Sequence, residues 1–185
     1  MRLLVYTCVF GGYDRVYPPL HADPAVDHVL VTDDARTRVA GWRTVLADRS
    51  RFAGSQAANR YYKMLAHREF PGYDASLYAD GNIRLLGRTA EFVAPFLRSG
   101  AALGAYRHPL RDTVAAEIEA CLAEGKLRER TAVDAEWAAY RAEGFADDRG
   151  LVEATILMKN HAHPALDAAM QLWWEQFERY GTRDQ

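Results

Sequence analysis

An acidic turn, Asp80-Gly81-Asn82, directly follows the strand-like run of residues 75–79. A strand there delivers the Asp80 carboxylate at its carboxyl end, and Gly81 allows the backbone to approach a ligand closely. Oxygen-bearing side chains at positions i and i+2 can share one hard cation, which can also bind phosphate oxygens. Asp-Gly and Gly-Asn are common turn pairs as well, so a plain turn remains the alternative.

A helix predicted over residues 55–70 precedes this turn in the chain. One face of this helix carries three cationic side chains, at spacings i, i+3 and i+7: Arg60, Lys63 and His67. Such a face can neutralise a diphosphate, both in a bound ligand and in a leaving group. A basic face exposed to solvent is the alternative. The residues expected to pack on a sheet from the other side of this helix are Ala58, Tyr61, Tyr62 and Leu65.

A second candidate group begins at His108, which could be a metal ligand, a phosphate contact or a plain loop residue. Glu117 lies at the margin of the apolar stripe of a helix predicted over residues 113–124, with Asp112 as its N-cap. A buried carboxylate without a partner is costly, so Arg111 or a substrate hydroxyl is expected beside Glu117. A structural Arg111–Glu117 pair and a binding role are equally compatible with the sequence.

Alternating residues in a strand predicted over residues 151–159 supply a further acid. The set expected to face the core is Val152, Ala154, Ile156 and Met158. Glu153 and Lys159 belong to the other set, so the alternation predicts that they point away from that core, toward a cleft.

Strand-like and helical segments alternate along the chain, which predicts one α/β domain over residues 1–185 with a largely parallel sheet. Ligands of such sheets bind outside the carboxyl ends of the strands. Three polar elements are therefore expected to converge on one crevice: Gly11-Gly12-Tyr13-Asp14, Asp33-Asp34 and Asp80-Gly81-Asn82. The predicted strands are 3–10, 28–32, 42–46, 75–79, 102–106 and 151–159, with extended structure at 83–86. The predicted helices are 55–70, 89–98, 113–124, 132–143 and 164–180.

The composition excludes several classes of function. Lys plus Arg number 23 and Asp plus Glu number 25, so no excess of positive charge is available for general nucleic-acid binding. No segment approaches the ~18 apolar residues of a membrane span, and the start of the chain lacks the features of a signal peptide. Cys8 and Cys121 are expected to be reduced, buried thiols, so we expect a cytoplasmic protein.

Several of these elements resemble, in the same order, the glycosyltransferase-like domain of plant pollen turgor-regulation and seed-mucilage proteins. The resemblance spans nearly the whole chain. The matching elements are Val5-Tyr6-Thr7, Phe10-Gly11-Gly12-Tyr13-Asp14, Thr32-Asp33, Arg60, Lys63, His67, Asp80-Gly81-Asn82, His108-Pro109, Arg111, Glu117 and Arg183-Asp184-Gln185. It implies a GT-A-like (nucleotide-diphospho-sugar transferase) three-layer sandwich.

The resemblance also implies roles for individual residues. Asp80 and Asn82 would form the metal-binding element for Mn²⁺ or Mg²⁺ on the donor diphosphate. Asp33 would contact the base or ribose, and Asp184 would lie on the acceptor side. The other residues implied as nucleotide-sugar contacts are Thr7, Gly11, Gly12, Tyr13, Asp14, Arg60, Lys63, His67, His108 and Arg111.

We therefore expect a glycosyltransferase that moves a sugar from a nucleoside-diphosphate sugar to a hydroxyl of a carbohydrate or other acceptor. Asp184, Glu153 or Glu117 would deprotonate the acceptor if the enzyme inverts configuration. One alternative is a metal-dependent hydrolase of a lipid-like amide or ester, with its ligands among His67, His108, His161 and His163. The other is a catalytically inactive sugar-nucleotide-binding module, because Asn82 replaces the second acid of an Asp-x-Asp element.

Overall fold

The centre of the sheet is β1 (Leu3–Val9), a run of apolar, aromatic and β-branched residues that is buried at every position. A strand covered on both faces requires such a composition. The computed structural model describes residues 1–21, 23–127 and 130–181. Within them the sheet has six strands in the order β3-β2-β1-β4-β6-β5.

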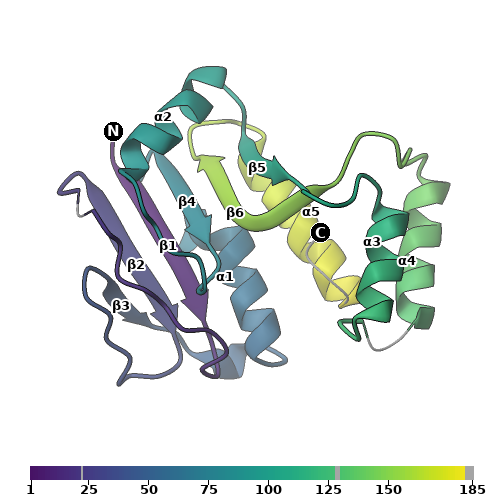
Figure 1. The fold of residues 1–185 in the computed structure, drawn as a ribbon, viewed down its shortest axis with the longest axis horizontal. Helices are drawn as coiled ribbons and strands as arrows, with labels where there is room; N and C mark the ends of the chain where they lie inside the picture. Colours follow the sequence, from purple (N-terminus) through teal and green to yellow (C-terminus); the bar gives the residue numbers. More distant parts are fainter. Residues whose placement is uncertain (22, 128–129, 182–185) are drawn as a thin grey trace. The chain divides into compact units, whose positions relative to one another are not determined.

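The secondary structure follows the predicted alternation closely (Figure 1). The strands are β1, β2 (Val26–Thr32), β3 (Arg43–Leu46), β4 (Ala75–Ala79), β5 (Leu103–Arg107) and β6 (Val152–Asn160). The helices are α1 (Ser55–Glu69), α2 (Thr89–Ser99), α3 (Val114–Ala123), α4 (Arg130–Ala142) and α5 (Leu166–Tyr180), with a short 3₁₀ turn η1 (Arg49–Arg51).

Parallel pairing places the polar strand ends at one edge of the sheet. β1 pairs in parallel with β2 and β4, and β2 pairs in parallel with β3. β6 runs antiparallel to β4, with Ser76 opposite Lys159. The loop after β1, Asp33 after β2 and Asp80 after β4 therefore share the carboxyl edge, which confirms their predicted convergence.

The chain divides into two compact units, which are described separately below. Unit 1 comprises Met1–Gly104 and Thr155–Trp174, and unit 2 comprises Ala105–Ala154 and the chain from Glu175 onward. The single domain expected over residues 1–185 stays a prediction.

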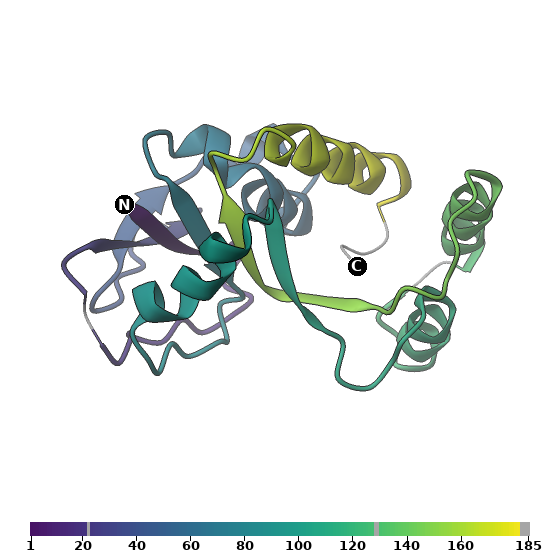
Figure 2. The ribbon, with the colours of Figure 1, turned by 90° about the horizontal axis from the view of Figure 1, so that it is seen from above.

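Unit 1 has three layers. α1 and the first part of α5 lie on one face of its strands, and α2 lies on the other (Figures 1 and 2). On the α2 face, Leu3 and Val5 belong to one buried cluster with Val93 and Phe96 of the helix. On the α1 face, the Tyr6 hydroxyl donates a hydrogen bond to the Lys63 carbonyl, at 2.9 Å. The predicted mostly parallel sheet between helical layers is thus confirmed.

Unit 2 contains α3 and α4, and side chains of both helices line one small pocket. The predicted N-cap of α3 is wrong: the side chain of Thr113, not Asp112, accepts the Ala116 N–H at 3.2 Å. Asp112 instead accepts hydrogen bonds from Arg107. A threonine hydroxyl and an aspartate carboxylate are both good caps, so adjacent candidates cannot be separated by composition.

Residues 83–86, expected to be extended, form no strand of the sheet, and the Leu85 carbonyl accepts the Leu20 N–H at 2.9 Å. A further expectation is wrong. In β6 the predicted sides are partly reversed: Val152 is 50% exposed, whereas Lys159 is 0% exposed. At the Lys159 end of β6 both faces are covered, because Met158 packs against the cluster on the α2 face and Lys159 binds the Met64 carbonyl of α1, so alternation does not separate core from cleft there.

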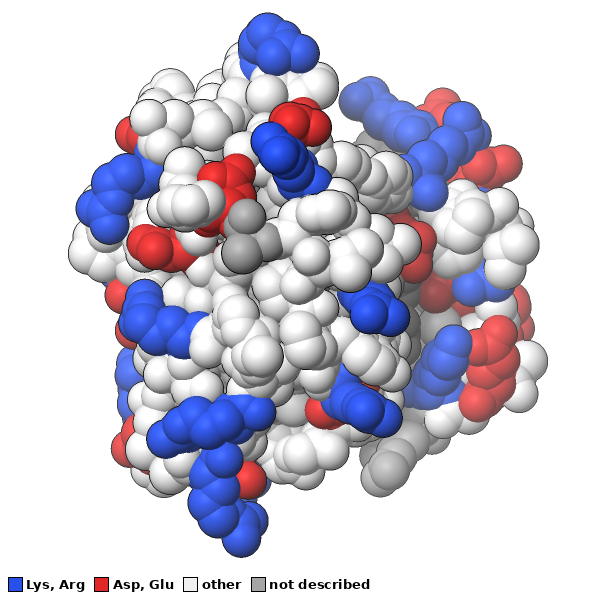
Figure 3. Space-filling model, turned by 60° about the vertical axis from the view of Figure 1, so that its left-hand side comes forward, with Lys and Arg blue, Asp and Glu red and all other residues white. Residues whose placement is uncertain are grey.

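Two features of the surface bear on partners. No helix among the described residues has the length and apolarity needed to cross a bilayer. On the face drawn in Figure 3, basic and acidic side chains are interspersed.

Candidate functional site

Asp80 is held at the carboxyl end of β4 by contacts from three directions. Its backbone N–H donates to the Thr155 carbonyl of β6 at 2.9 Å. The Tyr78 hydroxyl donates to Asp80 Oδ1 at 2.6 Å, and Lys63 Nζ lies 3.7 Å from the same oxygen. The Asp80 side chain keeps 27% of its surface exposed, so the carboxylate is fixed in place yet reachable.

Lys63 links α1 to the acidic turn. Its side chain is only 3% exposed, and its ammonium lies 5.1 Å from the centre of the Tyr78 ring. Aromatic faces attract cations, so Tyr78 stabilises both members of the Lys63–Asp80 pair. The alternative of a solvent-exposed basic face is therefore wrong for Lys63, because α1 turns this cation into the protein toward Asp80.

The other two cations of α1 have different surroundings. Arg60 is half-buried and donates to the Asn59 side-chain oxygen at 2.6 Å. His67 lies one turn beyond Lys63 and contacts Asp167 of α5 at 2.9 Å, where Arg68 also binds. Burial lowers the pKa of His67 despite the Asp167 contact, which disfavours the cationic form. His67 is thus engaged with α5, and its predicted role at the diphosphate stays untested.

Gly81 is required by close packing behind Asp80. A Cβ atom there would lie 2.8 Å from the Cβ of Asp14 and 2.8 Å from Cγ2 of Val9. The Asp14 side chain therefore packs directly against the Asp80-Gly81-Asn82 turn. Burial and then the charge of Asp80 raise the pKa of Asp14, as expected for a second carboxylate in this position. Asn82 is exposed at the same turn.

The loop after β1 turns sharply through two glycines, Gly11 and Gly12, with φ of 64° and 66°. This left-handed conformation favours glycine. The Gly11 N–H donates to Asp33 Oδ1 at 2.9 Å, which ties the ends of β1 and β2 together. Tyr13 is 89% exposed at the tip of the loop, whereas Thr7 is 1% exposed inside β1. Thr7 is thus buried within the sheet, and its contact with a nucleotide stays a prediction.

An open hollow of about 770 Å³ adjoins Asp33. Arg49 binds the second oxygen of Asp33, with Nε 2.9 Å from Oδ2. Small-molecule sites span roughly 300–1,000 Å³, so this hollow has the size of a nucleoside-binding site. The residues lining it are Asp33, Leu46, Ala47, Asp48, Arg49, Ser50, Phe52, Ala53 and Gly54.

The sequence did not predict that the segment after β3, from Ala47 to Gly54, lines this hollow. The segment after β3 has an ordinary loop composition, and the Arg49–Asp33 pair is a long-range contact that no local spacing reveals. One local signal was present: Asp48 accepts the Ser50 N–H at 2.9 Å and begins η1. An Asp-x-Ser pattern after a strand is typical of such a turn.

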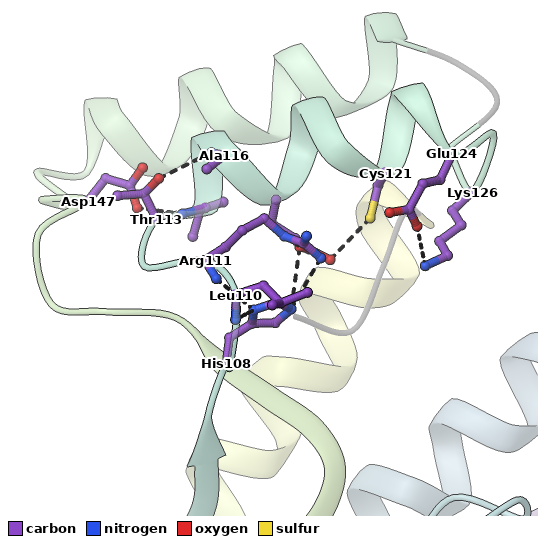
Figure 4. Close-up of polar contacts among 11 residues, drawn as sticks. His108, Leu110, Arg111, Thr113, Ala116, Cys121, Glu124, Lys126 and Asp147 are labelled. Atoms are coloured by element: carbon purple, nitrogen blue, oxygen red, sulfur yellow. Dashed lines mark hydrogen bonds and ion pairs between the residues drawn. The ribbon is translucent and has the colours of Figure 1, made fainter.

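In unit 2, Arg111 and Glu117 form the pair that the sequence suggested (Figure 4). Arg111 Nε donates to Glu117 Oε2, and the Cys121 thiol donates to Oε1 at 3.1 Å. His108 Nδ1 accepts the backbone N–H groups of Leu110 and Arg111, at 3.2 and 3.0 Å. Both oxygens of Glu117 are thus occupied, and His108 fixes the turn that carries Arg111.

These contacts bear on the predicted catalytic role of Glu117. Burial alone would raise its pKa, but hydrogen bonds from Cys121 and Arg111 outweigh burial and lower it. A carboxylate of lowered pKa is a weaker general base. The geometry therefore favours the structural pair, and a catalytic role for Glu117 stays untested, as do donor contacts by His108 and Arg111.

The two remaining base candidates are less constrained. Glu153 is half-buried in the part of β6 that belongs to unit 2. Asp184 lies outside the described residues, together with its neighbours at the chain end. Their roles on the acceptor side stay predictions.

The side chains at the carboxyl edge fit a hard cation. Asp80 and Asn82, with Asp14 against the intervening Gly81, offer carboxylate and amide oxygens only. Oxygen donors of this kind suit Mg²⁺ or Mn²⁺ rather than zinc. Within residues 1–21, 23–127 and 130–181, no three His, Cys, Asp or Glu side chains gather as a metal site, including the histidines of the hydrolase alternative.

Cys8 and Cys121 are both buried and neither forms a disulfide with a described residue, as predicted. Burial raises the pKa of the Cys8 thiol, so it stays protonated and unreactive.

Two kinds of comparison place this geometry among known proteins. The chain is 24% identical over 209 aligned residues to "Probable hexosyltransferase MUCI70" of Arabidopsis thaliana, an alignment covering 99% of this chain and 36% of that protein. The chain thus spans about a third of the length of this relative. Residues 22–185 also match the family model described as "TOD1/MUCI70, glycosyltransferase-like domain".

Solved structures support the same fold. Mouse xyloside xylosyltransferase 1 superposes with a TM-score of 0.53 at 9% identity, covering 99% of this chain and 77% of that one. The galactosyltransferase LgtC, bound to donor and acceptor sugar analogues, gives a TM-score of 0.50 at 12% identity, covering 96% and 65%. At these identities the likeness establishes the GT-A fold alone. With the family match over most of its length, the chain belongs to the TOD1/MUCI70 glycosyltransferase-like domain family.

Proposed function

We propose that this domain transfers a sugar from a nucleoside-diphosphate sugar to a hydroxyl group of an acceptor. One observation carries the proposal: Lys63 and Asp14 both contact the Asp80-Gly81 turn at the carboxyl edge of the sheet, and Asp33 of the hollow lies at the same edge. A diphosphate needs fixed positive charge and a cation site, and a nucleoside needs an adjoining hollow. Family membership and the hexosyltransferase name of the Arabidopsis relative support the same reaction.

The nucleoside end of the donor would enter the hollow at Asp33. Gly11 and Arg49 hold the two oxygens of Asp33 in fixed directions, so its remaining lone pairs can accept hydrogen bonds from ribose hydroxyls or base N–H groups. The exposed ring of Tyr13 at the loop tip is available for stacking on the base.

The diphosphate would bind on the exposed side of the acidic turn, with the buried Lys63 ammonium behind Asp80. Lys63 supplies a cation that is already held in place before the ligand arrives, so no reorganisation is needed as charge develops on the departing diphosphate. Asp80 and Asn82 would hold Mn²⁺ or Mg²⁺. Such a cation, when bound, offsets negative charge on the diphosphate.

The missing second acid of the Asp-x-Asp element has a substitute nearby. Asn82 contributes only a neutral oxygen, but the Asp14 carboxylate packs against Gly81 between the two proposed ligands. A total of two carboxylates at the turn therefore favours an active domain over an inactive binding module. Asp184 and Glu153 remain the candidates for the group that accepts the proton of the acceptor hydroxyl.

A thermal-shift screen with UDP-glucose, UDP-xylose and GDP-mannose, each with and without Mn²⁺, tests the proposal. A ligand at 100 times its Kd stabilises the folded state by about 2.7 kcal/mol, which for a chain of this size raises the Tm by roughly 5–10 °C. We expect at least one donor to give such a shift with Mn²⁺. The shift should be lost in Asp80→Ala.

The matched control is Glu91→Ala, because Glu91 is an acid of α2 whose side chain is 74% exposed. It should keep the full shift. Absence of any shift with these donors at millimolar concentration, or an equal loss in both variants, would contradict the proposed function.

A further inference from the structure

Lys159 of β6 is a fully buried lysine that the proposed reaction does not use. It is 0% exposed, and its ammonium makes three hydrogen bonds. Its acceptors are the Tyr6 hydroxyl at 2.9 Å, the Met64 carbonyl at 2.9 Å and the Lys63 carbonyl. An ammonium has three N–H donors, so every one is satisfied, and all three acceptors are uncharged.

Such a residue is costly as a purely structural element. Burial lowers the pKa of Lys159 to about 7, because the charged form loses its hydration. An apolar side chain of similar length would fill the same space without this cost. The polar contacts are therefore the property that distinguishes Lys159 from a methionine at this position.

Those contacts lead to Asp80 by two routes. On the first, Lys159 binds the carbonyl of Lys63, whose own side chain lies 3.7 Å from Asp80. On the second, Lys159 binds the Tyr6 hydroxyl, and the Tyr6 ring packs on Tyr78 with centroids 5.3 Å apart. The Tyr78 hydroxyl donates to Asp80. Lys63 and Tyr78, the two side chains that fix Asp80, are thus both linked to Lys159. Lys63 is linked through its carbonyl, and Tyr78 is linked through the ring of Tyr6.

We propose that Lys159 is a positioning residue: its hydrogen bonds hold α1 in the position in which the Lys63 ammonium contacts Asp80. Its role at a sugar-nucleotide site rests on the proposed function. The coupling between Lys63 and Asp80 does not, and it can be measured without a donor.

A double-mutant cycle measures that coupling. Unfolding equilibrium constants from urea denaturation are determined for Lys63→Met, Asp80→Asn and the double variant, first in the otherwise natural chain and then with Lys159→Met added. Neighbouring charged pairs couple by at least about twofold in the unfolding equilibrium constant. We expect such a coupling with Lys159 present and a factor near one in the Lys159→Met background.

Two results overturn the proposal: an equal coupling in both backgrounds, or no coupling even when Lys159 is present. The control is Leu157→Met, which alters an equally buried residue of the same strand without touching a polar contact. It should preserve the coupling. A loss there as large as in Lys159→Met would mean that any loosening of the core suffices, and would also overturn the proposal.

A second variant covers the case in which Lys159→Met does not fold. Tyr6→Phe keeps the ring and removes only the hydroxyl that joins Lys159 to Lys63. We expect the coupling between Lys63 and Asp80 to fall in this background too. A Tyr6→Phe chain with undiminished coupling contradicts the proposal.

Calorimetry with UDP-glucose and Mn²⁺ then tests whether the coupling between Lys63 and Asp80 affects donor affinity. If the natural chain binds this donor, Lys159→Met should weaken the affinity severalfold, and Leu157→Met should not. A chain that binds none of the three donors named above contradicts the proposed function, while the measured coupling still decides the role of Lys159.

Discussion

Each unit of this protein contains a carboxylate paired with a cation and a third polar group, and the two differ in what remains open. Both partners of Asp80 in unit 1 lie on one oxygen, Oδ1. In unit 2, Arg111 occupies one oxygen of Glu117 and Cys121 the other. The side chain of Asp80 is 27% exposed and that of Glu117 is 9% exposed.

The difference teaches how a charged pair can be assigned to binding or to structure. A carboxylate with one oxygen held and the other open is oriented for a ligand, whereas one with both oxygens engaged is already satisfied. Each pair joins one cation to one carboxylate, and the contacts of the two carboxylate oxygens make the distinction. Breaking the Lys63–Asp80 pair should therefore weaken ligand binding most. Breaking the Arg111–Glu117 pair should weaken folding instead.

The largest expected effect is on ligand binding at Asp80. Asp80→Asn preserves the size of the side chain and removes its charge, so we expect affinity for a nucleotide sugar with Mn²⁺ to fall about 10–100-fold. Isothermal titration calorimetry measures this loss, with Glu91→Gln as the control. Unchanged affinity would show that the open carboxylate is not a ligand-binding group.

Glu117→Gln should lower stability and leave donor binding unchanged. It leaves the Arg111 guanidinium without its carboxylate, at a cost of about 1–3 kcal/mol in the free energy of unfolding. Urea denaturation measures that cost, and calorimetry should find the donor affinity unaltered. A normal stability with impaired binding would instead assign the Arg111–Glu117 pair to the donor site.

Gly81→Ala should sharpen the contrast by damaging only the open site. The new Cβ would collide with Asp14 and Val9, and overpacking of this kind costs about 1–3 kcal/mol. We expect a lower Tm and weaker Mn²⁺-dependent binding than in Gly87→Ala. Gly87 is the matched control because nothing lies within 4 Å of an added Cβ there. Equal behaviour of the two variants would contradict the close packing of Asp14.

Acid should also separate the two units. Burial lowers the pKa of His161 in unit 1 to about 4 from its usual 6.5, so the unfolded chain binds a proton first and stability falls as the pH drops from 6.5 toward 4. The pKa of Glu117 in unit 2 is lowered from 4.5 by Cys121 and Arg111 despite burial, so its contribution is lost only below that pH.

Hydrogen exchange measured at pH 6.5, 5.5 and 4.5 checks this order. Amides of β4 and β6 near His161 should lose protection over this range, while those of α3 should keep theirs. Earlier loss of protection in α3 would contradict it. His161→Gln, which removes one titrating group, should reduce the loss of protection in β4, while His67, whose pKa burial also lowers, continues to contribute.

The sequence predicted what depends on local chemistry. The apolar run of β4 and the turn at Asp80 were found because a buried strand that stops at Asp-Gly is a local pattern. The pairing of Asp33 with Arg49 was missed because it joins a strand end to a distant loop. Lys159 was assigned to a cleft because alternation alone cannot reveal a helix packed over the same face of the strand.

The route of the chain through the sheet has a consequence for how such domains can vary. The strands β5 and β6 are neighbours in the sheet, yet the segment Ala105–Ala154 of unit 2 lies between their unit 1 portions in sequence. The residues of β6 that pair with β4, Ile156 to Asn160, and Thr155, whose carbonyl accepts the Asp80 N–H, lie outside this segment. Changes in the length or composition of α3 and α4 would therefore leave the residues that hold the Asp80 turn in place.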